Sequence, residues 1–275
     1  MGILRTDRVS GLGGANAIKG SVFFANGTGS YNGYLRVYLN SDNRSNFLLD
    51  GDFTIECWVF KQKSTPSGEY DGLLWISSAW RFKWQQSDKI MYYQNSNADA
   101  QFMNYNTNEG FLDNNWHHLA IVRSSNTITG YVDGTSYGTA TQSNDFNPST
   151  NTELRIGYNA HGFGGYISNL RVVKGTAVYT GNFTPPTSEL TEIDGTVLLC
   201  CQSSTDVTQE ATGNYLIESV HLVGTSYSGN AKPPSASRFT PNSPVGFSTT
   251  SDVGTQFGST FDGVTTFDSQ AYMVV

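Results

Sequence analysis

The residues of this sequence that could carry out chemistry do not fall into any common catalytic arrangement. His117 and His118 are adjacent, so in a strand they point to opposite faces, which is poor geometry for a shared metal ion or a catalytic dyad. His161 and His221 have no Cys, Asp or Glu at a metal-ligand spacing. No serine or cysteine lies in a Gly-x-Ser-x-Gly motif. We therefore expect the first two histidines to be hydrogen-bonded structural groups.

Paired carboxylates are missing as well. Glycoside hydrolysis needs two carboxyl groups about 5 to 9.5 Å apart, and on a strand such a pair follows an acidic-x-acidic pattern. Glu56 is the only acid in its predicted strand, where its same-face neighbours are Thr54 and Trp58. The sequence therefore predicts that this protein is not an enzyme.

Composition narrows the classes of partner. The net charge of -7 and the pI near 5.0 disfavour binding along a phosphate backbone, which depends on clustered Lys and Arg, so we expect no nucleic acid partner. No apolar run reaches the roughly 20 residues of a membrane span, and residues 1–20 lack the apolar core of a signal peptide. The chain is predicted to be soluble, without membrane insertion or signal-dependent export. Cys57, Cys200 and Cys201 lie in strand-like runs and are expected to be small buried hydrophobic residues.

The elements that must position these residues are short strands. The 29 glycines, the many Asn, Ser and Thr and the 14% of charged residues indicate strands joined by polar turns. The clearest hairpin lies within residues 111–134, where an alternating run from Trp116 to Arg123 is followed by a polar turn and by a second run that ends at Asp133-Gly134. In residues 52–60 one face is wholly apolar and the other carries aromatic residues, which predicts a sandwich strand buried on both sides.

A succession of six motifs carries a family resemblance. In order they are Asp52-Phe-Thr-Ile-Glu-Cys-Trp-Val, Trp116-His-His-Leu-Ala-Ile-Val-Arg, Gly130-Tyr-Val-Asp-Gly, Leu154-Arg-Ile-Gly, Gly165-Tyr-Ile-Ser-Asn-Leu-Arg-Val and Phe183-Thr-Pro-Pro-Thr. Together they are similar to laminin-G-like domains of the concanavalin-A-like lectin and glucanase superfamily. The resemblance implies an all-β jelly roll, a sandwich of two antiparallel sheets. The catalytic strand motif of the related glucanases is absent.

The resemblance divides the chain into an N-terminal arm at residues 1–19, a sandwich at 20–203 and a C-terminal extension at 204–275. The extension contains a proline-rich linker at 232–246, and its residues 257–275 repeat the pattern of the first strands. The distance from Phe23 to Tyr34 is 34 minus 23, or 11 residues, and that from Phe261 to Tyr272 is 272 minus 261, also 11. The alternative to a true internal repeat is chance similarity between two glycine-rich strand pairs.

An isolated strand pair is marginally stable in water, so the repeated tail is expected to dock on the chain's own sandwich or on a neighbouring copy. The tail residues expected to make this assembly contact are Phe261, Phe267, Tyr272 and Val274.

Two kinds of ligand are implied by the resemblance. Calcium could be held by carboxylates at turns, and the candidates are Asp50, Asp52, Asp71, Asp113, Asp133 and Asp145, although Asp is also common in turns for its own backbone hydrogen bonds. Carbohydrate could bind where aromatic and amide side chains are dense. That stretch contains Trp80, Trp84, Tyr92, Tyr93 and Tyr105, with Asn95, Asn97 and Asn104 nearby. The alternative is that these aromatic residues fill the core or an assembly interface.

Residues 174–187, Lys-Gly-Thr-Ala-Val-Tyr-Thr-Gly-Asn-Phe-Thr-Pro-Pro-Thr, resemble in particular the form found in bacteriophage structural proteins. The resemblance implies a virion protein assembled in the host cytoplasm, a capsid decoration or fibre subunit that contacts other virion proteins or copies of itself as a homo-oligomer. The second hypothesis is an adhesin that recognises cell-surface glycans during host attachment.

Overall fold

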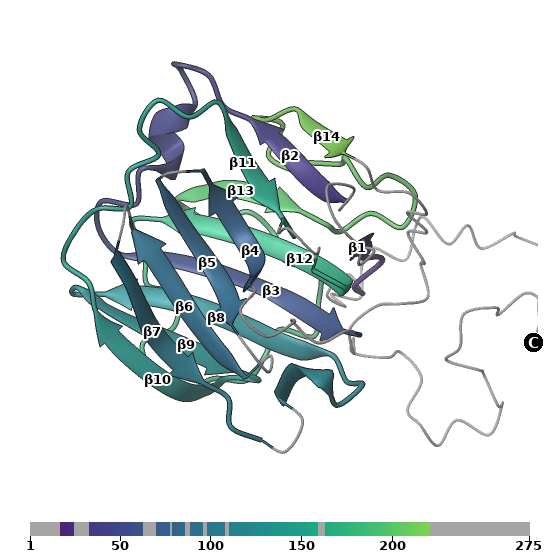
Figure 1. The fold of residues 1–275 in the computed structure, drawn as a ribbon. Coiled ribbons are helices and arrows are strands. Elements are labelled where there is room, and N and C mark those ends of the chain that lie inside the picture. Colours follow the sequence, from purple (N-terminus) through teal and green to yellow (C-terminus); the bar gives the residue numbers. More distant parts are fainter. Residues whose placement is uncertain are drawn as a thin grey trace, which may run out of the picture.

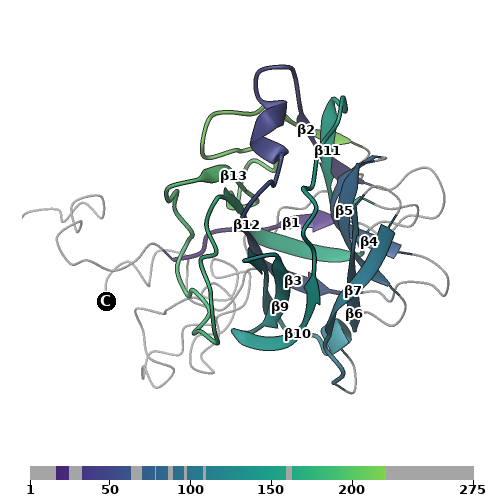
Figure 2. The ribbon, with the colours of Figure 1, turned by 90° about the vertical axis from the view of Figure 1, so that its left-hand side faces the viewer.

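The computed structural model of this chain describes residues 17–24, 33–62, 70–77, 79–85, 89–95, 98–107, 110–158 and 163–220. Two seven-stranded antiparallel sheets pack face to face in a sandwich (Figures 1 and 2), which confirms the predicted fold. Two 3₁₀ helices, η2 (Arg44–Phe47) and η3 (Gly110–Leu112), lie in the connections. Within the described ranges, no helix has the length and apolar composition required to span a bilayer.

The first sheet, called the β3 sheet here, has the order β1-β12-β3-β8-β9-β10, and β13 pairs with β12. Its strands are β1 (Val22–Phe24), β3 (Phe53–Lys61), β8 (His117–Ser124), β9 (Thr127–Val132), β10 (Thr135–Thr141), β12 (Gly165–Lys174) and β13 (Thr196–Cys200). The predicted hairpin is confirmed as β8 and β9. Ser125 and Asn126 between them both have positive φ, as expected of a two-residue hairpin turn whose twist matches the strands.

The second sheet, called the β4 sheet here, has the order β14-β2-β11-β4-β5-β6-β7. Its strands are β2 (Tyr34–Tyr38), β4 (Tyr70–Ile76), β5 (Trp80–Gln85), β6 (Ile90–Asn95), β7 (Ala98–Asn104), β11 (Glu153–Ile156) and β14 (Ile217–Val220). Strand β14 pairs with β2, so the sandwich continues past residue 203, and the predicted extension contributes one strand to it. The predicted arm up to residue 16 and the tail from 221 onward lie outside the described residues.

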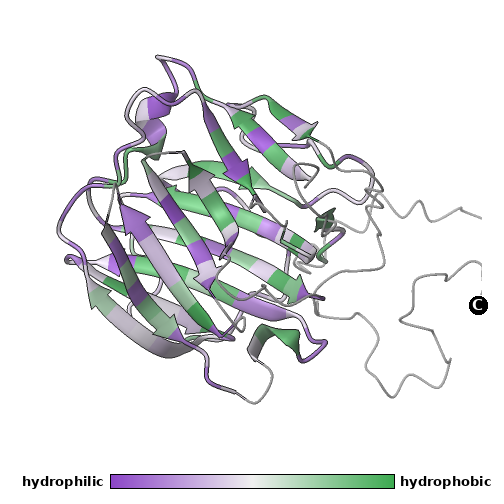
Figure 3. Cartoon of the chain, viewed as in Figure 1, coloured by the Kyte–Doolittle hydropathy of each residue, from purple (hydrophilic) through white to green (hydrophobic). Residues whose placement is uncertain are grey.

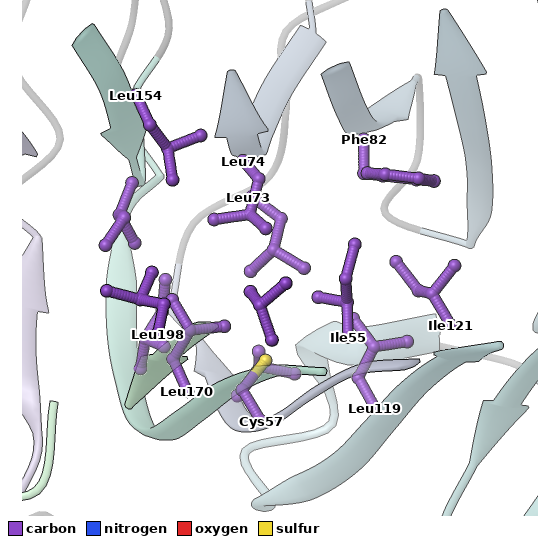
Figure 4. Close-up of a cluster of buried hydrophobic side chains, with 14 of the residues drawn as sticks. Ile55, Cys57, Leu73, Leu74, Phe82, Leu119, Ile121, Leu154, Leu170 and Leu198 are labelled. Carbon is purple, nitrogen blue, oxygen red and sulfur yellow. The ribbon is translucent and has the colours of Figure 1, made fainter. Parts of the chain in front are cut away.

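The core lies between the two sheets and is built by alternation along the strands. In β3 the inward residues Phe53, Ile55, Cys57 and Val59 are fully buried, and they meet leucines and phenylalanines from β4, β5 and β8 (Figure 4). Figure 3 shows that hydrophilic and hydrophobic residues alternate along the strands of the β4 sheet. Because side chains of a strand alternate between its faces, one face is buried and the other is turned outward.

The outer face of the β3 sheet is also covered, by the segment 176–191, which we call the cover segment. Thr54 Oγ1 donates to the carbonyl of Thr176 and accepts from the amide of Val178. Tyr179 and Phe183 stack on each other, with centroids 3.6 Å apart, above Ala120, Val122 and Tyr131. This second cluster explains why β3 is buried on both sides, as its sequence predicts.

A buried ion pair joins the two sheets. Lys61 Nζ on β3 and Asp71 Oδ2 on β4 form an ion pair of 2.6 Å across the sandwich, and both side chains are almost completely buried. The three cysteines are free thiols and are buried, as predicted, and the Sγ atoms of Cys200 and Cys201 lie 3.8 Å apart. Burial is the largest cause that raises the pKa of Cys57 well above its ordinary value.

Asp71→Ala should strongly destabilise the sandwich, because it leaves the buried ammonium of Lys61 without its carboxylate. A broken buried ion pair costs about 3–5 kcal/mol, whereas replacing both charges by apolar groups is often neutral or stabilising. We therefore expect Lys61→Met/Asp71→Leu to recover most of the free energy of unfolding that Asp71→Ala loses. Urea denaturation of the three proteins at one pH measures this, and a double variant no better than the single one would contradict it.

Candidate functional site

The aromatic residues predicted to bind carbohydrate lie mostly in the core. Trp80, Trp84, Tyr93 and Tyr105 expose 1%, 0%, 4% and 7% of their surface, so none of them can stack on a sugar, and this part of the prediction is wrong. The physical reason is the alternation in β5, where the two tryptophans and Phe82 share the inward face. Burial of their apolar surface contributes hydrophobic free energy to folding, and exposure at the surface would lose that contribution.

Two of the predicted residues do reach the surface. Tyr92 on β6 is half-buried on the outer face of the β4 sheet, and its hydroxyl lies 3.4 Å from Gln101 Oε1. Asn95 at the end of β6 donates to the backbone carbonyl of Asp145 at 2.9 Å. These two residues stay a prediction, and Asn97 lies outside the described residues.

The outer face of the β4 sheet carries a row of side chains that the sequence did not reveal. Strand pairing places Glu218, Arg36, Arg155, Trp75, Arg81, Gln94 and Asp99 directly opposite one another, one from each of the seven strands. We call this set the charged row. All seven are half-buried or exposed, and six strand intervals of about 4.8 Å make the row roughly 29 Å long.

The centre of the charged row is an aromatic and guanidinium layer. The guanidinium carbon of Arg81 lies 3.9 Å from the ring centroid of Trp75, and its Nε donates to the side chain of Gln94. On the other side, the guanidinium carbon of Arg155 lies 4.3 Å from the ring centroid of Tyr158. The rings of Tyr158 and Trp75 are arranged edge to face, with their centroids 5.6 Å apart. Such cation–π contacts fix long side chains in place, so the row presents a preorganised surface.

Gly72 allows Tyr158 to reach this position. The backbone amide of Gly72 donates to the carbonyl of Tyr158 at 3.1 Å, and a Cβ at residue 72 would lie 2.3 Å from that oxygen. A side chain there would push the two backbones apart. The glycine in β4 therefore sets the distance between Tyr158 and Trp75.

The two ends of the charged row are held by ion pairs. At one end Arg36 lies 2.8 Å from Glu153 and 3.1 Å from Glu218, and Arg155 also binds Glu153. At the other end Lys83 pairs with Asp99 at 2.7 Å. Burial lowers the pKa of Lys83, although Asp99 opposes the shift.

His117 is a hydrogen-bonded structural group, as predicted, whereas the buried ring nitrogens of His118 make no hydrogen bond among the described residues. Nδ1 and Nε2 of His117 lie 2.7 Å from Asp133 and 2.9 Å from Asp113. Burial alone would lower the pKa of His117, but the hydrogen bonds to both carboxylates outweigh it and raise that pKa. His118 lies on the opposite face, fully buried, with Nε2 3.3 Å from Glu56.

Glu56 is the centre of a buried network under the cover segment. Its carboxylate accepts from Arg171 Nε at 3.0 Å and from the hydroxyl of Tyr179 at 2.7 Å. Burial alone would raise the pKa of Glu56, but His118 and Arg171 lower it overall. The carboxylate therefore connects β3, β8, β12 and the cover segment, and it is closed to solvent.

The aspartates predicted as calcium ligands do not converge. Asp113 and Asp133 hold His117, Asp71 pairs with Lys61, and Asp50 contacts Lys174 at 3.4 Å. Asp52 accepts from the amide of Ser125, and Asp145 receives Asn95 at its backbone carbonyl. Within the described part of the chain, no group of three or more His, Cys, Asp or Glu side chains is placed to hold a metal ion.

Two antiparallel sheets packed face to face define a β-sandwich of the jelly-roll class. The family model of the concanavalin A-like lectin/glucanases superfamily matches residues 22–177, more than half of the sequence. The chain therefore belongs to this family. No curated protein matches the sequence.

Similarity to a solved structure supports the same fold. A candidate carbohydrate-binding protein of Bacteroides ovatus is similar at 14% identity with a TM-score of 0.54, over 74% of this chain and 58% of that one. This chain thus spans little more than half of that protein. Domains LG4-5 of the mouse laminin α1 chain match at 18% identity and a TM-score of 0.42, over 66% of this chain and 46% of that one. A heptameric pentraxin of Limulus polyphemus matches at 14% identity and 0.39, over 57% and 77%.

The stability contributed by His117 should disappear as the pH rises. Its folded-state pKa is raised above the ordinary value of 6.5, so the contribution is complete below about pH 6.5 and is lost as the pH passes through the folded-state pKa. A neutral imidazole has one N–H and cannot donate to both carboxylates. We expect His117→Gln to cost about 1.5–3 kcal/mol at pH 6 and clearly less at pH 9. Denaturant titrations of both proteins across this range measure it, and a cost that grows with pH would refute it.

Proposed function

We propose that this protein is a non-enzymatic glycan-binding module, and that the charged row on the β4 sheet is its binding surface. The observation that carries the proposal is the composition of this row. An aromatic ring, Trp75, lies at its centre, and guanidinium, amide and carboxylate groups extend from the ring to both sides. Sugars are bound by this combination, because a ring covers the apolar face of a pyranose while polar groups bond its hydroxyls.

Several features support binding rather than hydrolysis. The carboxylates in and beside the row are engaged by cations: Arg36 pairs with Glu218 in the row and with the neighbouring Glu153, and Lys83 pairs with Asp99. Glu56, the acid within a family motif, is buried under the cover segment and bonded to Arg171. A glycosidase needs one carboxyl group free to donate a proton to the leaving group. The release of reducing sugar from any polysaccharide would contradict the non-enzymatic assignment.

Trp75→Ala should weaken glycan binding at least tenfold, a loss of about 1.4 kcal/mol, because it removes the ring at the centre of the row. The measurement is binding of the multivalently displayed protein to a broad array of cell-surface glycans, with and without a calcium chelator. Ile193→Ala is the control, since it removes an exposed apolar side chain that belongs to neither the charged row nor the outer aromatic residues of the other sheet.

Four outcomes of this array are informative. Binding lost in Trp75→Ala and kept in Ile193→Ala supports the charged row. Equal binding by both variants and the unmodified protein would show that the glycan-binding site lies outside the charged row. Binding abolished by the chelator would revive calcium as a ligand. Silence across the array would contradict the proposed function.

The sequence resemblance also suggests a place of action. We propose that the module works in a virion, as a decoration or fibre subunit that attaches to host glycans and assembles through its terminal segments. The expected assembly residues Phe261, Phe267, Tyr272 and Val274 lie outside the described residues. The strands that they repeat, β1 and β2, pair with β12 and with β11 and β14, so a docked copy would add through strand pairing.

Deletion of residues 250–275 should reduce the oligomeric state if the tail docks on a neighbouring copy. The measurement is the molar mass in solution by light scattering, for the full chain and the shortened chain at equal concentration. An unchanged mass would contradict the intersubunit contact while leaving glycan binding untouched.

A further inference from the structure

A group of four aromatic side chains lies on the outer face of the β3 sheet, opposite to the charged row. Phe23, Tyr166 and Phe60 are direct partners across β1, β12 and β3, and Trp116, which precedes β8, continues the line. Ring centroids are 4.8 Å apart for Phe23 and Tyr166, 6.1 Å for Tyr166 and Phe60, and 5.6 Å for Phe60 and Trp116. The ring of Trp116 also leans to within 6.2 Å of Tyr166. We call these four residues the aromatic cluster.

The aromatic cluster is the part of this face that the cover segment leaves open. The next same-face residues along the strands, Trp58, His118 and Ser168, are buried. All four rings of the cluster are half-buried instead. A contiguous group of exposed rings costs hydrophobic free energy, and such patches commonly mark binding sites.

The surroundings of the aromatic cluster indicate an uncharged ligand. On its open side Gln62 lies two residues beyond Phe60, and Asn114 lies two residues before Trp116, and both amides are exposed. The chain carries a net charge of -7, which opposes the approach of an anionic polymer. A neutral ligand meets no such repulsion.

The size of the aromatic cluster indicates a small or thin ligand. Four half-buried rings offer roughly 300 Å² at most, well below the approximately 800 Å² that each partner contributes to a standard protein interface. Adjacent rings are separated by about the length of one sugar residue, and three strand intervals span roughly 14 Å. These dimensions fit one chain of a polysaccharide better than a folded protein.

We propose that the aromatic cluster is a second binding site, which holds a neutral linear polysaccharide across strands β1, β12 and β3 and Trp116. Sugar rings lie against Phe23, Tyr166, Phe60 and Trp116, and the amides of Gln62 and Asn114 bond hydroxyl groups at the rim. This extends the proposed glycan recognition to a second surface and a different class of ligand. It does not depend on the charged row, because the two sites lie on opposite faces of the sandwich.

Titration calorimetry with neutral linear oligosaccharides of the cello-, xylo- and manno- series, from monosaccharide to hexasaccharide, tests the proposal. We expect the affinity for at least one series to rise with chain length up to three or four residues and then to level off. Trp116→Ala should lower the affinity for these longer chains at least tenfold, and Trp116→Phe should retain most of it. Ile193→Ala is the control and should bind them like the unmodified protein, because this exposed side chain belongs to neither candidate surface.

Four results would overturn the second site: no binding in any series, an affinity independent of chain length, binding lost in Trp75→Ala but kept in Trp116→Ala, or self-association that disappears in Trp116→Ala. The last result would assign the aromatic cluster to a contact between copies. The two proposals fail separately, because an array signal that depends on Trp75 supports the charged row even when every neutral oligosaccharide is inert. Equal urea midpoints for the variants show that folding is intact.

Discussion

Register between neighbouring strands is the constraint on which the rest of this structure depends. Side chains alternate between the faces of a strand, so a slip of one residue would exchange the core and the surface along that strand. In register, residues far apart in sequence become neighbours, as Arg36 and Arg155 do on adjacent strands of the β4 sheet. Both candidate surfaces are consequences of this constraint. Each is a line of side chains that crosses the strands, and neither would exist as a continuous surface in another pairing.

The cover segment decides which parts of the outer surface remain available. It closes most of one face of the β3 sheet, and the buried carboxylate of Glu56 links it to that sheet through Tyr179. A buried carboxylate needs several donors, and Arg171 supplies another of them. The outer face of the β4 sheet keeps a solvated, charged surface instead. The sandwich therefore has two outer faces of different chemistry, one polar and charged across its strands and one partly covered, with an aromatic margin at β1, β12 and β3.

Much of the fold could be predicted because its signals are local. Alternation and turn residues determine the hairpin of β8 and β9, and two apolar faces indicate that β3 is buried on both sides. The site could not be predicted in the same way. The density of Trp80 and Trp84 suggested a surface, although their alternation with Arg81 already indicated that they share the inward face. The position of Trp75 beside Arg155 depends on pairing between distant strands and on a bulge in β4, which sequence alone does not fix.

The three cysteines give the sandwich an internal reporter. Cys57, Cys200 and Cys201 are shielded from solvent in the folded chain, and burial contributes to raising the pKa of Cys57 and Cys200. A thiol reagent can modify them only after the surrounding core opens. The rate of labelling in the native protein therefore measures openings of the core in the absence of denaturant.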